Sequence, residues 1–262
     1  MKIVVCVKQV PDISQAKVDP ETYTIIRTGV DAVVNPFDLY AVEAALQIKD
    51  NLPQTKVTAI SMGPPQAEAA LKEVISMGVD DAILLSSKHF AGSDTLATSY
   101  VLSKAINQIK DVDLIITGRQ AIDGDTAQVG PGIAAHLNLP LVTDVNGIVE
   151  IKPDELKIKA MTEEGYLYYF LPLPALISIG KGIGEPRMPS LRNKSRARKA
   201  IIPVWTPEEI DAEYQKIGLK GSPTQVVKIF TPEVGGEVLF IEGEPPQQAE
   251  RMVEILGQRH II

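Results

Sequence analysis

A glycine-rich segment at residues 118–132 has the composition of a phosphate-binding turn. It follows an apolar run, precedes a helix-forming stretch and contains Gly118 and Gly124. Glycine lets the backbone pass close to a ligand, and the free amides at the start of a helix can point at phosphate oxygens. Thr126 and Gln128 add hydrogen-bonding side chains. The segment therefore predicts a site for a phosphorylated ligand, with an ordinary strand-to-helix turn as the alternative.

Other catalytic patterns are missing from the sequence. The three histidines are scattered, there is no Gly-x-Ser-x-Gly motif, and Cys6 is the single cysteine. The glycines at 180–184 are followed by Pro186 and Pro189, so no helix opens there to bind a phosphate. Asp123 and Asp125 would repel a phosphate, and we expect them to cap the turn or to accept from a ribose hydroxyl or an amide. Any redox chemistry must therefore come from a bound cofactor.

Strand and helix patterns alternate four times over the first half of the chain. The expected strands are 2–7, 57–61, 82–86 and 114–117, and the expected helices are 37–50, 64–77, 94–109 and 126–137. This alternation predicts an α/β fold with a mostly parallel, doubly wound sheet. Ligands on such sheets bind at the carboxyl ends of the strands, so the glycine-rich segment should lie at that edge.

The second half of the chain has a different pattern. Further strands are expected at 143–151, 156–160, 166–171 and 175–179, as an antiparallel extension of the sheet. We divide the chain into a nucleotide-binding domain at 1–202, which ends in a basic loop at 181–202, and a C-terminal arm at 203–262. The arm is expected to contain helices at 207–216 and 246–258. Its core looks too small to stand alone, so we expect the arm to pack on a partner chain.

The chain has a net charge of −7, but one of its segments is strongly basic. No acid occurs between Glu185 and Glu208, and the basic residues there are Arg187, Arg192, Lys194, Arg196, Arg198 and Lys199. A nucleic-acid-binding protein would usually be basic over a whole face, so no nucleic acid is expected. We expect Leu191 to be an apolar contact for a partner, ringed by these cations. A solvated loop is the alternative.

The ends and the apolar runs of the sequence indicate its compartment. No stretch reaches 18 apolar residues, so no transmembrane segment is expected. The chain begins at once with the strand at 2–7 and shows no signal-peptide pattern. A single cysteine excludes an internal disulfide. We therefore expect a cytoplasmic protein.

Six motifs spread over nearly the whole chain resemble the β subunits of electron-transfer flavoproteins. They are Val7–Asp12, Asn35–Asp38, Met62–Pro65, Ala91–Thr98, Gly118–Pro131 and Gly221–Gln225. The resemblance implies an adenine-nucleotide α-hydrolase-like sheet and a heterodimer with an α subunit that carries its own FAD. The segments Gln9–Asp12 and Asp123–Pro131 are similar to those of the electron-bifurcating members, whose β subunit holds a second FAD. In the other members the same cleft holds AMP, and the loop is bulkier and more acidic at the Gly124 position.

The resemblance also implies the ligand contacts. The adenosine part would contact Cys6, Asn35, Pro36, Phe37, Asp38, Met62, Gly63, Gly118, Arg119, Gln120, Ala121 and Ile122. The diphosphate would lie on Asp123, Gly124, Asp125, Thr126, Ala127, Gln128 and Val129, with Thr224 near the flavin or the subunit interface. Leu191 matches the partner-recognition leucine of the family, and Arg187, Arg192, Lys194 and Arg196 surround it in sequence.

The bifurcating group implies a place in anaerobic electron transport. Its β-site FAD accepts hydride from NADH, and the electrons go to ferredoxin or flavodoxin and, through the α-subunit FAD, to an acyl-CoA or lactate-type dehydrogenase. Three alternatives remain open. They are a non-bifurcating β subunit with structural AMP, an adenylating or ATP-using enzyme, and a stand-alone nucleotide sensor. The second would need a phosphate-binding loop after the first strand, which Lys8–Asp12 lacks, and the long arm argues against the third.

Overall fold

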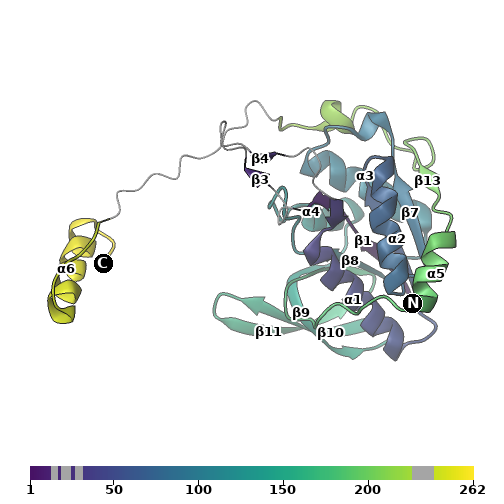
Figure 1. Ribbon diagram of the computed structural model, residues 1–262. Coiled ribbons are helices and arrows are strands. Elements are labelled where there is room, and N and C mark those ends of the chain that lie inside the picture. Colours follow the sequence, from purple (N-terminus) through teal and green to yellow (C-terminus); the bar gives the residue numbers. More distant parts are fainter. Residues whose placement is uncertain (13–16, 19–24, 27–31, 226–238) are drawn as a thin grey trace. The chain divides into compact units, whose positions relative to one another are not determined.

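The computed structural model describes residues 1–12, 17–18, 25–26, 32–225 and 239–262 (Figure 1). The chain divides into two compact units, Met1–Val227 and Lys228–Ile262. The expected division at residue 202 therefore lies inside the first unit. Residues 203–225, which we assigned to the arm, belong to the unit that contains the large sheet.

The centre of the first unit is a sheet of buried, parallel strands. Strand β1 (Lys2–Cys6) pairs in parallel with β6 (Lys56–Met62) on one side and with β8 (Leu114–Gly118) on the other. Strand β7 (Asp81–Leu85) continues the sheet beyond β6. These strands are continuous apolar runs because both faces of the sheet are covered. Within the described residues the strand order is β11-β10-β9-β12-β8-β1-β6-β7-β13.

Helices cover both faces of this sheet, as the alternating pattern predicts. Helices α1 (Pro36–Asn51) and α2 (Glu68–Met77) pack in one apolar core. Helices α3 (Thr95–Ile109) and α4 (Val129–Leu137) pack in a second core on the opposite face. The doubly wound α/β fold is therefore confirmed (Figure 1). Helix α4 begins at Val129, later than the expected residue 126.

The antiparallel extension is only partly as expected. Strands β9 (Leu141–Ile151), β10 (Glu155–Thr162) and β11 (Gly165–Pro172) do pair antiparallel. Strand β12 (Ala175–Ile179) instead runs parallel to both β8 and β9 and lies between them. Its prediction as an antiparallel strand was wrong. All five of its residues are buried, as in a central parallel strand.

The basic segment is not simply a loop. Residues Leu191–Lys199 form helix α5, which packs against α2. The Ser190 side chain caps α5 by accepting from the Asn193 amide at 3.1 Å. The Arg196 guanidinium donates to the carbonyls of Ile75 and Val79, at the end of α2 and just beyond it, at 3.0 and 2.6 Å. The expectation of a loop throughout 181–202 was therefore wrong for this part.

The remaining elements are short or lie in the second unit. Strand β13 (Val204–Trp205) pairs with β7, and the helix expected at 207–216 is a series of turns followed by the short helix η4 (Gly218–Gly221). Two small antiparallel pairs join β2 (Gln9–Pro11) to β5 (Ala32–Val34) and β3 (Lys17–Val18) to β4 (Ile25–Ile26). The second unit contains helix α6 (Pro245–Gln258), which has no buried residue.

Candidate functional site

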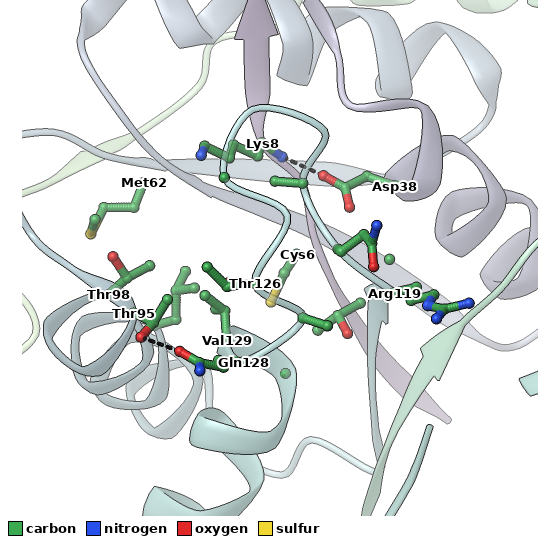
Figure 2. Close-up of a pocket in the computed structure, with 18 of the residues that line it drawn as sticks. Cys6, Lys8, Asp38, Met62, Thr95, Thr98, Arg119, Thr126, Gln128 and Val129 are labelled. Carbon is green, nitrogen blue, oxygen red and sulfur yellow. Dashed lines mark hydrogen bonds between the residues drawn. The ribbon is translucent and has the colours of Figure 1, made fainter. Parts of the chain in front are cut away.

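A cavity of about 330 Å³ lies at the carboxyl edge of the parallel strands, where the sequence places the site. Cys6, Met62 and Gly118 end β1, β6 and β8, and all three line this cavity. Figure 2 shows Cys6, Met62, Thr95 and Arg119 around it, from elements that are far apart in the sequence. The volume is in the range of small-molecule sites.

The back of the cavity is held by Asn35, which is fully buried. Asn35 occupies the N-cap position of α1, but its side chain does not cap the helix. Its Nδ2 donates to the Gln120 carbonyl at 2.8 Å, and its Oδ1 accepts from the Ile122 amide at 3.2 Å. Asn35 therefore fixes the glycine-rich segment to the start of α1. These hydrogen bonds explain why a polar side chain can be fully buried here.

Gly118 is required at this position because backbone passes next to it. A Cβ on Gly118 would lie 2.3 Å from Asp38 Oδ1 and 2.9 Å from the Asp38 amide nitrogen. Any side chain would therefore separate β8 from the first turn of α1. This half of the glycine-rich segment serves packing between parts of the protein.

The buried carboxyl group of Asp38 sits next to the cavity. Its Oδ2 accepts from the Lys8 amide at 2.7 Å (Figure 2). Burial raises the pKa of Asp38 to about 7, against the lowering effect of hydrogen bonds that include the one from Lys8. Burial, followed by the nearby Asp38, raises the pKa of the Cys6 thiol well above its usual value. Cys6 is therefore a protonated thiol and not a nucleophile.

The front of the cavity is the loop Gly124–Gln128, whose backbone has an anion-binding geometry. Asp125 and Ala127 have left-handed φ values of 51° and 54°, while Gln128 is right-handed. Alternating left- and right-handed residues turn successive amides toward one concavity, which binds anions. Within the part of the chain that the structure describes, the amides of Thr126, Ala127 and Gln128 find no protein acceptor. Left-handed non-glycine residues are costly and cluster at ligand sites.

Gly124 differs from Gly118 in its surroundings. A Cβ built on Gly124 meets no protein atom within 4 Å, and its φ is not left-handed. Packing therefore gives no reason for a glycine here. Gly124 lines the cavity, so the open space beside it is available to a ligand.

Two side-chain pairs fix the ends of this loop. Lys8 Nζ forms an ion pair with both carboxylate oxygens of Asp123 at 2.8 Å. Thr95 Oγ1 donates to Gln128 Oε1 at 2.9 Å, which joins the loop to the first turn of α3 (Figure 2). Asp123 was expected to cap the turn or to accept from a ribose hydroxyl or an amide, and the structure pairs its carboxylate with Lys8 instead. The loop is thus joined at one end to Lys8, just after β1, and at the other end to α3. Between these ends, Asp125 is bonded to Gln120 and Ala121, and the amides of Thr126–Gln128 stay free of acceptors among the described residues.

The structure brings most of the expected ligand contacts together. Those that line the cavity are Cys6, Asp38, Met62, Gly118, Arg119, Gln120, Ala121, Gly124, Asp125, Thr126, Ala127, Gln128 and Val129. The expected residues outside the lining are Asn35, Pro36, Phe37, Gly63, Ile122, Asp123 and Thr224. Of these, Asn35 and Asp123 act on the loop from behind, and Thr224 is bonded to a lining residue, Asp94.

Sequence reasoning did not assign every lining residue. The additional ones are Val7, Lys8, Ser93, Asp94, Thr95, Thr98, Leu102, Thr117 and Gly130. Those on α3 had a signal, because the helix predicted to start at residue 94 follows a strand that ends at the same sheet edge. Arg119, expected at the adenosine, forms an ion pair with Asp144 at 3.3 Å.

The expected partner residues fall into two groups. Leu191 is 87% exposed, and Arg192 and Lys194 on the same helix are also exposed. Arg187 is bound within the chain, because its guanidinium donates to Glu43 at 2.8 and 2.9 Å and to Asp50 at 2.8 Å. Arg196 is bound to α2 and its C-terminal turn, as described above. Arg187 and Arg196 therefore support the basic segment, whereas Leu191, Arg192 and Lys194 are available to a partner.

Comparison with known families agrees with this arrangement. Residues 22–210 match the family model described as the electron transfer flavoprotein domain. The chain belongs to the electron transfer flavoprotein family. The matched residues include the cavity lining from Asp38 to Gly130, whereas the lining residues Cys6, Val7 and Lys8 precede the match.

Curated members of the electron transfer flavoprotein family match the chain over its full length. The electron transfer flavoprotein subunit beta of Megasphaera elsdenii is 45% identical over 271 residues, with both chains fully covered. The caffeyl-CoA reductase-Etf complex subunit CarD of Acetobacterium woodii is 44% identical, again with full coverage of both. The acryloyl-CoA reductase electron transfer subunit gamma of Anaerotignum propionicum is 42% identical with the same coverage.

The cavity of this electron transfer flavoprotein chain has features that suit a phosphorylated ligand. Unpaired amides at Thr126–Gln128 suit phosphate oxygens, and the space beside Gly124 admits a ligand close to the backbone. Among the described residues, no helix is long and apolar enough to cross a membrane.

Proposed function

We propose that this chain is the β subunit of a heterodimeric, electron-bifurcating electron transfer flavoprotein and holds FAD in the cavity between β1, β8 and α3. Bound FAD would supply the chemistry, accepting hydride from NADH and releasing single electrons to ferredoxin or flavodoxin and to the FAD of the α subunit. The α-subunit FAD would serve a partner dehydrogenase, all in the cytoplasm. The protein's own side chains need not act as acid or base.

The residues of this chain would bind and orient the cofactor. The amides of Thr126, Ala127 and Gln128 would hold the diphosphate, and Lys8 would keep Asp123 away from it through their ion pair at 2.8 Å. Asn35 would keep the segment 120–122 in place from behind. The protonated Cys6 thiol would contact the adenosine part as an inert, apolar group.

The observation that carries the choice of FAD over AMP is the open space at Gly124. Its Cβ direction is free of protein atoms for 4 Å, and the residue lies in the cavity lining beside the anion-binding amides. A ligand that extends past this point has room along the loop, as a dinucleotide requires. A β subunit that holds AMP as a structural nucleotide is the second candidate, and the residues behind the cavity would suit it equally.

The names of the relatives suggest which dehydrogenase or reductase receives electrons from the complex. Two of them are named as parts of the caffeyl-CoA reductase complex and of acryloyl-CoA reductase, which favours an acyl-CoA dehydrogenase or reductase as the partner here. A lactate-type dehydrogenase is the other candidate. Leu191, Arg192 and Lys194 on the exposed face of α5 would contact the partner. Helix α6, which has no buried residue, would pack on the α subunit.

Counting cofactors in the purified heterodimer tests this proposal. Two FAD per heterodimer and no AMP are expected, whereas one FAD and one AMP would contradict it. Gly124→Asp should remove the FAD of this chain and leave that of the α subunit, because the carboxylate would fill the space beside the phosphates and repel them. Gly124→Ala, which adds no charge, is the matched control and should retain more FAD than Gly124→Asp.

A further inference from the structure

A joint between two segments lies beside the cavity. We call Phe90–Asp94, before α3, and Ile217–Thr224, near the end of the first unit, the joint. Ser222 is 7% exposed, donates to the Gly218 carbonyl at 2.7 Å and accepts from the Asp94 amide at 2.8 Å. The bond from the Asp94 amide connects residues that are far apart in the sequence.

Two glycines let the segments of the joint approach each other closely. A Cβ on Gly92, whose φ is +75°, would lie 2.6 Å from Leu219 Cδ2. A Cβ on Gly218, whose φ is +59°, would lie 2.3 Å from the His89 carbonyl oxygen. Both positions therefore need glycine for the backbone conformation and for the contact. The joint is a specific fit between the two segments.

Asp94 uses its two carboxylate oxygens for two different purposes. Oδ1 caps α3 by accepting from the amides of Leu96 and Ala97, each at 3.0 Å. Oδ2 accepts from Thr224, from the amide at 3.1 Å and from Oγ1 at 2.8 Å. Four donors are about the full capacity of one carboxylate. The start of α3 and the end of the described part of the first unit thus share one side chain.

The charge state of Asp94 agrees with this role. Burial acts to raise the pKa of Asp94, but hydrogen bonds from Ala97, Thr224 and Leu96 outweigh it and hold the pKa below its usual value. The carboxylate is therefore ionised at neutral pH and accepts at both oxygens.

The first turn of α3 is also a wall of the cavity. Ser93, Asp94, Thr95 and Thr98 line it, and Thr95 donates to Gln128 of the loop with the free amides. Movement of this turn would change the cavity opposite those amides. Asp94 fixes this turn and also accepts hydrogen bonds from Thr224. The same side chain therefore stabilises both the cavity wall and the joint.

We propose that Asp94 is a positioning residue that couples the cavity to the joint, and so to the segment that leads into the second unit at Lys228. This inference rests on the proposed function, because it takes an adenine nucleotide as the ligand. A nucleotide that binds better when the turn is fixed must also stabilise the Asp94–Thr224 contact, since coupling between two sites is reciprocal. Nucleotide occupancy is thereby communicated to Thr224, near the end of the described part of the first unit.

Hydrogen exchange of the Thr224 amide in the purified heterodimer tests the coupling, with AMP and FAD as the added ligands. Binding of either nucleotide should slow this exchange about fivefold, at the low end of typical couplings. In Asp94→Asn, one oxygen remains for the helix cap, but the amide nitrogen cannot accept from Thr224. The Thr224 amide should then exchange quickly with or without nucleotide, and the Kd for AMP should rise about fivefold.

Two controls separate positioning from general stability. Thr224→Val removes only the hydroxyl donor. It should speed exchange of the residue 224 amide and raise the Kd for AMP, each by less than Asp94→Asn does. Asp113→Asn changes a carboxylate that accepts from the Lys2 amide at 2.7 Å, at the opposite sheet edge, and should change neither. Nucleotide binding that leaves Thr224 exchange unchanged, or an unaltered Kd in Asp94→Asn, would overturn the coupling alone. If neither nucleotide binds to the wild type, the proposed function fails together with it.

Discussion

The two halves of the glycine-rich segment solve different problems with the same residue type. A Cβ on Gly118 would meet protein atoms, with Asp38 Oδ1 at 2.3 Å, whereas a Cβ on Gly124 would meet none within 4 Å. Asn35 holds the first half. The second half is joined to Lys8 and Thr95 near its ends and to Gln120 and Ala121 through Asp125, while the amides of Thr126–Gln128 have no acceptor in the described part of the chain. The comparison shows that one glycine serves the fold and the other is free to serve a ligand. This difference between Gly118 and Gly124 can be tested by substitutions whose effects on the free energy of unfolding and on ligand affinity are measured separately.

The largest effect is expected at Gly118. Gly118→Ala should lower the free energy of unfolding by about 3 kcal/mol, because the new methyl group forces β8 away from the first turn of α1. Chemical denaturation, with the midpoint and slope compared to wild type, measures the loss. A loss below about 0.5 kcal/mol, the usual range for a surface substitution, would mean that Gly118 is not a packing position.

A pH-dependent effect on stability is expected from Asp38, which supports the same half of the segment. Its folded-state pKa is about 7 and its ordinary value is 3.8, so between these values the folded chain keeps a proton that the unfolded chain releases. The contribution of Asp38 to the free energy of unfolding should therefore fall as pH rises through this window. The fall should reach at most about 1.4 kcal/mol per pH unit and level off above about pH 7.

Asp38→Asn isolates this contribution because asparagine does not titrate. Denaturation series between about pH 4.5 and about pH 8 should give a flatter pH profile for Asp38→Asn than for wild type. Asp113→Asn, at the opposite sheet edge, should retain the wild-type profile. Equal slopes in wild type and Asp38→Asn would show that the Asp38 carboxyl is already ionised throughout this window.

Local patterns were enough to predict the parallel sheet and the edge at which the cavity lies. Strands such as β1 and β8 are short, continuous apolar runs, and the carboxyl ends of parallel strands must meet at one edge. The same reasoning brought together Cys6, Met62 and Gly118, which come from three separate strands. This reasoning used the spacing of apolar residues and the direction of the chain through each strand. Both are local properties of the sequence.

The errors arose where tertiary contacts choose between local possibilities. Strand β12 follows two antiparallel strands in sequence, yet it pairs in parallel with β8, a choice that sequence order does not determine. Its unbroken apolar run, Ala175–Ile179, was the available signal of a buried parallel strand. Helix α5 had a cap signal at Ser190, but its highly charged sequence conceals the contact with α2. Asn35 was expected to contact the ligand, yet it lies outside the cavity lining, and its bonds to residues 120–122 depend on a contact across the fold.

The smallest effect on stability, and the sharpest test of the comparison, is expected at Gly124. Gly124→Ala should change the free energy of unfolding by no more than about 0.5 kcal/mol, and in the stabilising direction, because the φ suits alanine and the unfolded chain loses freedom. Its methyl group nevertheless enters the cavity, so the Kd for FAD or AMP should rise about tenfold, a loss of about 1.4 kcal/mol. Parallel denaturation and nucleotide titrations of Gly124→Ala and Gly118→Ala would show whether the two glycines separate in this way. A large loss of stability at Gly124 would instead make both positions structural, and the ligand would have to be placed elsewhere along the loop.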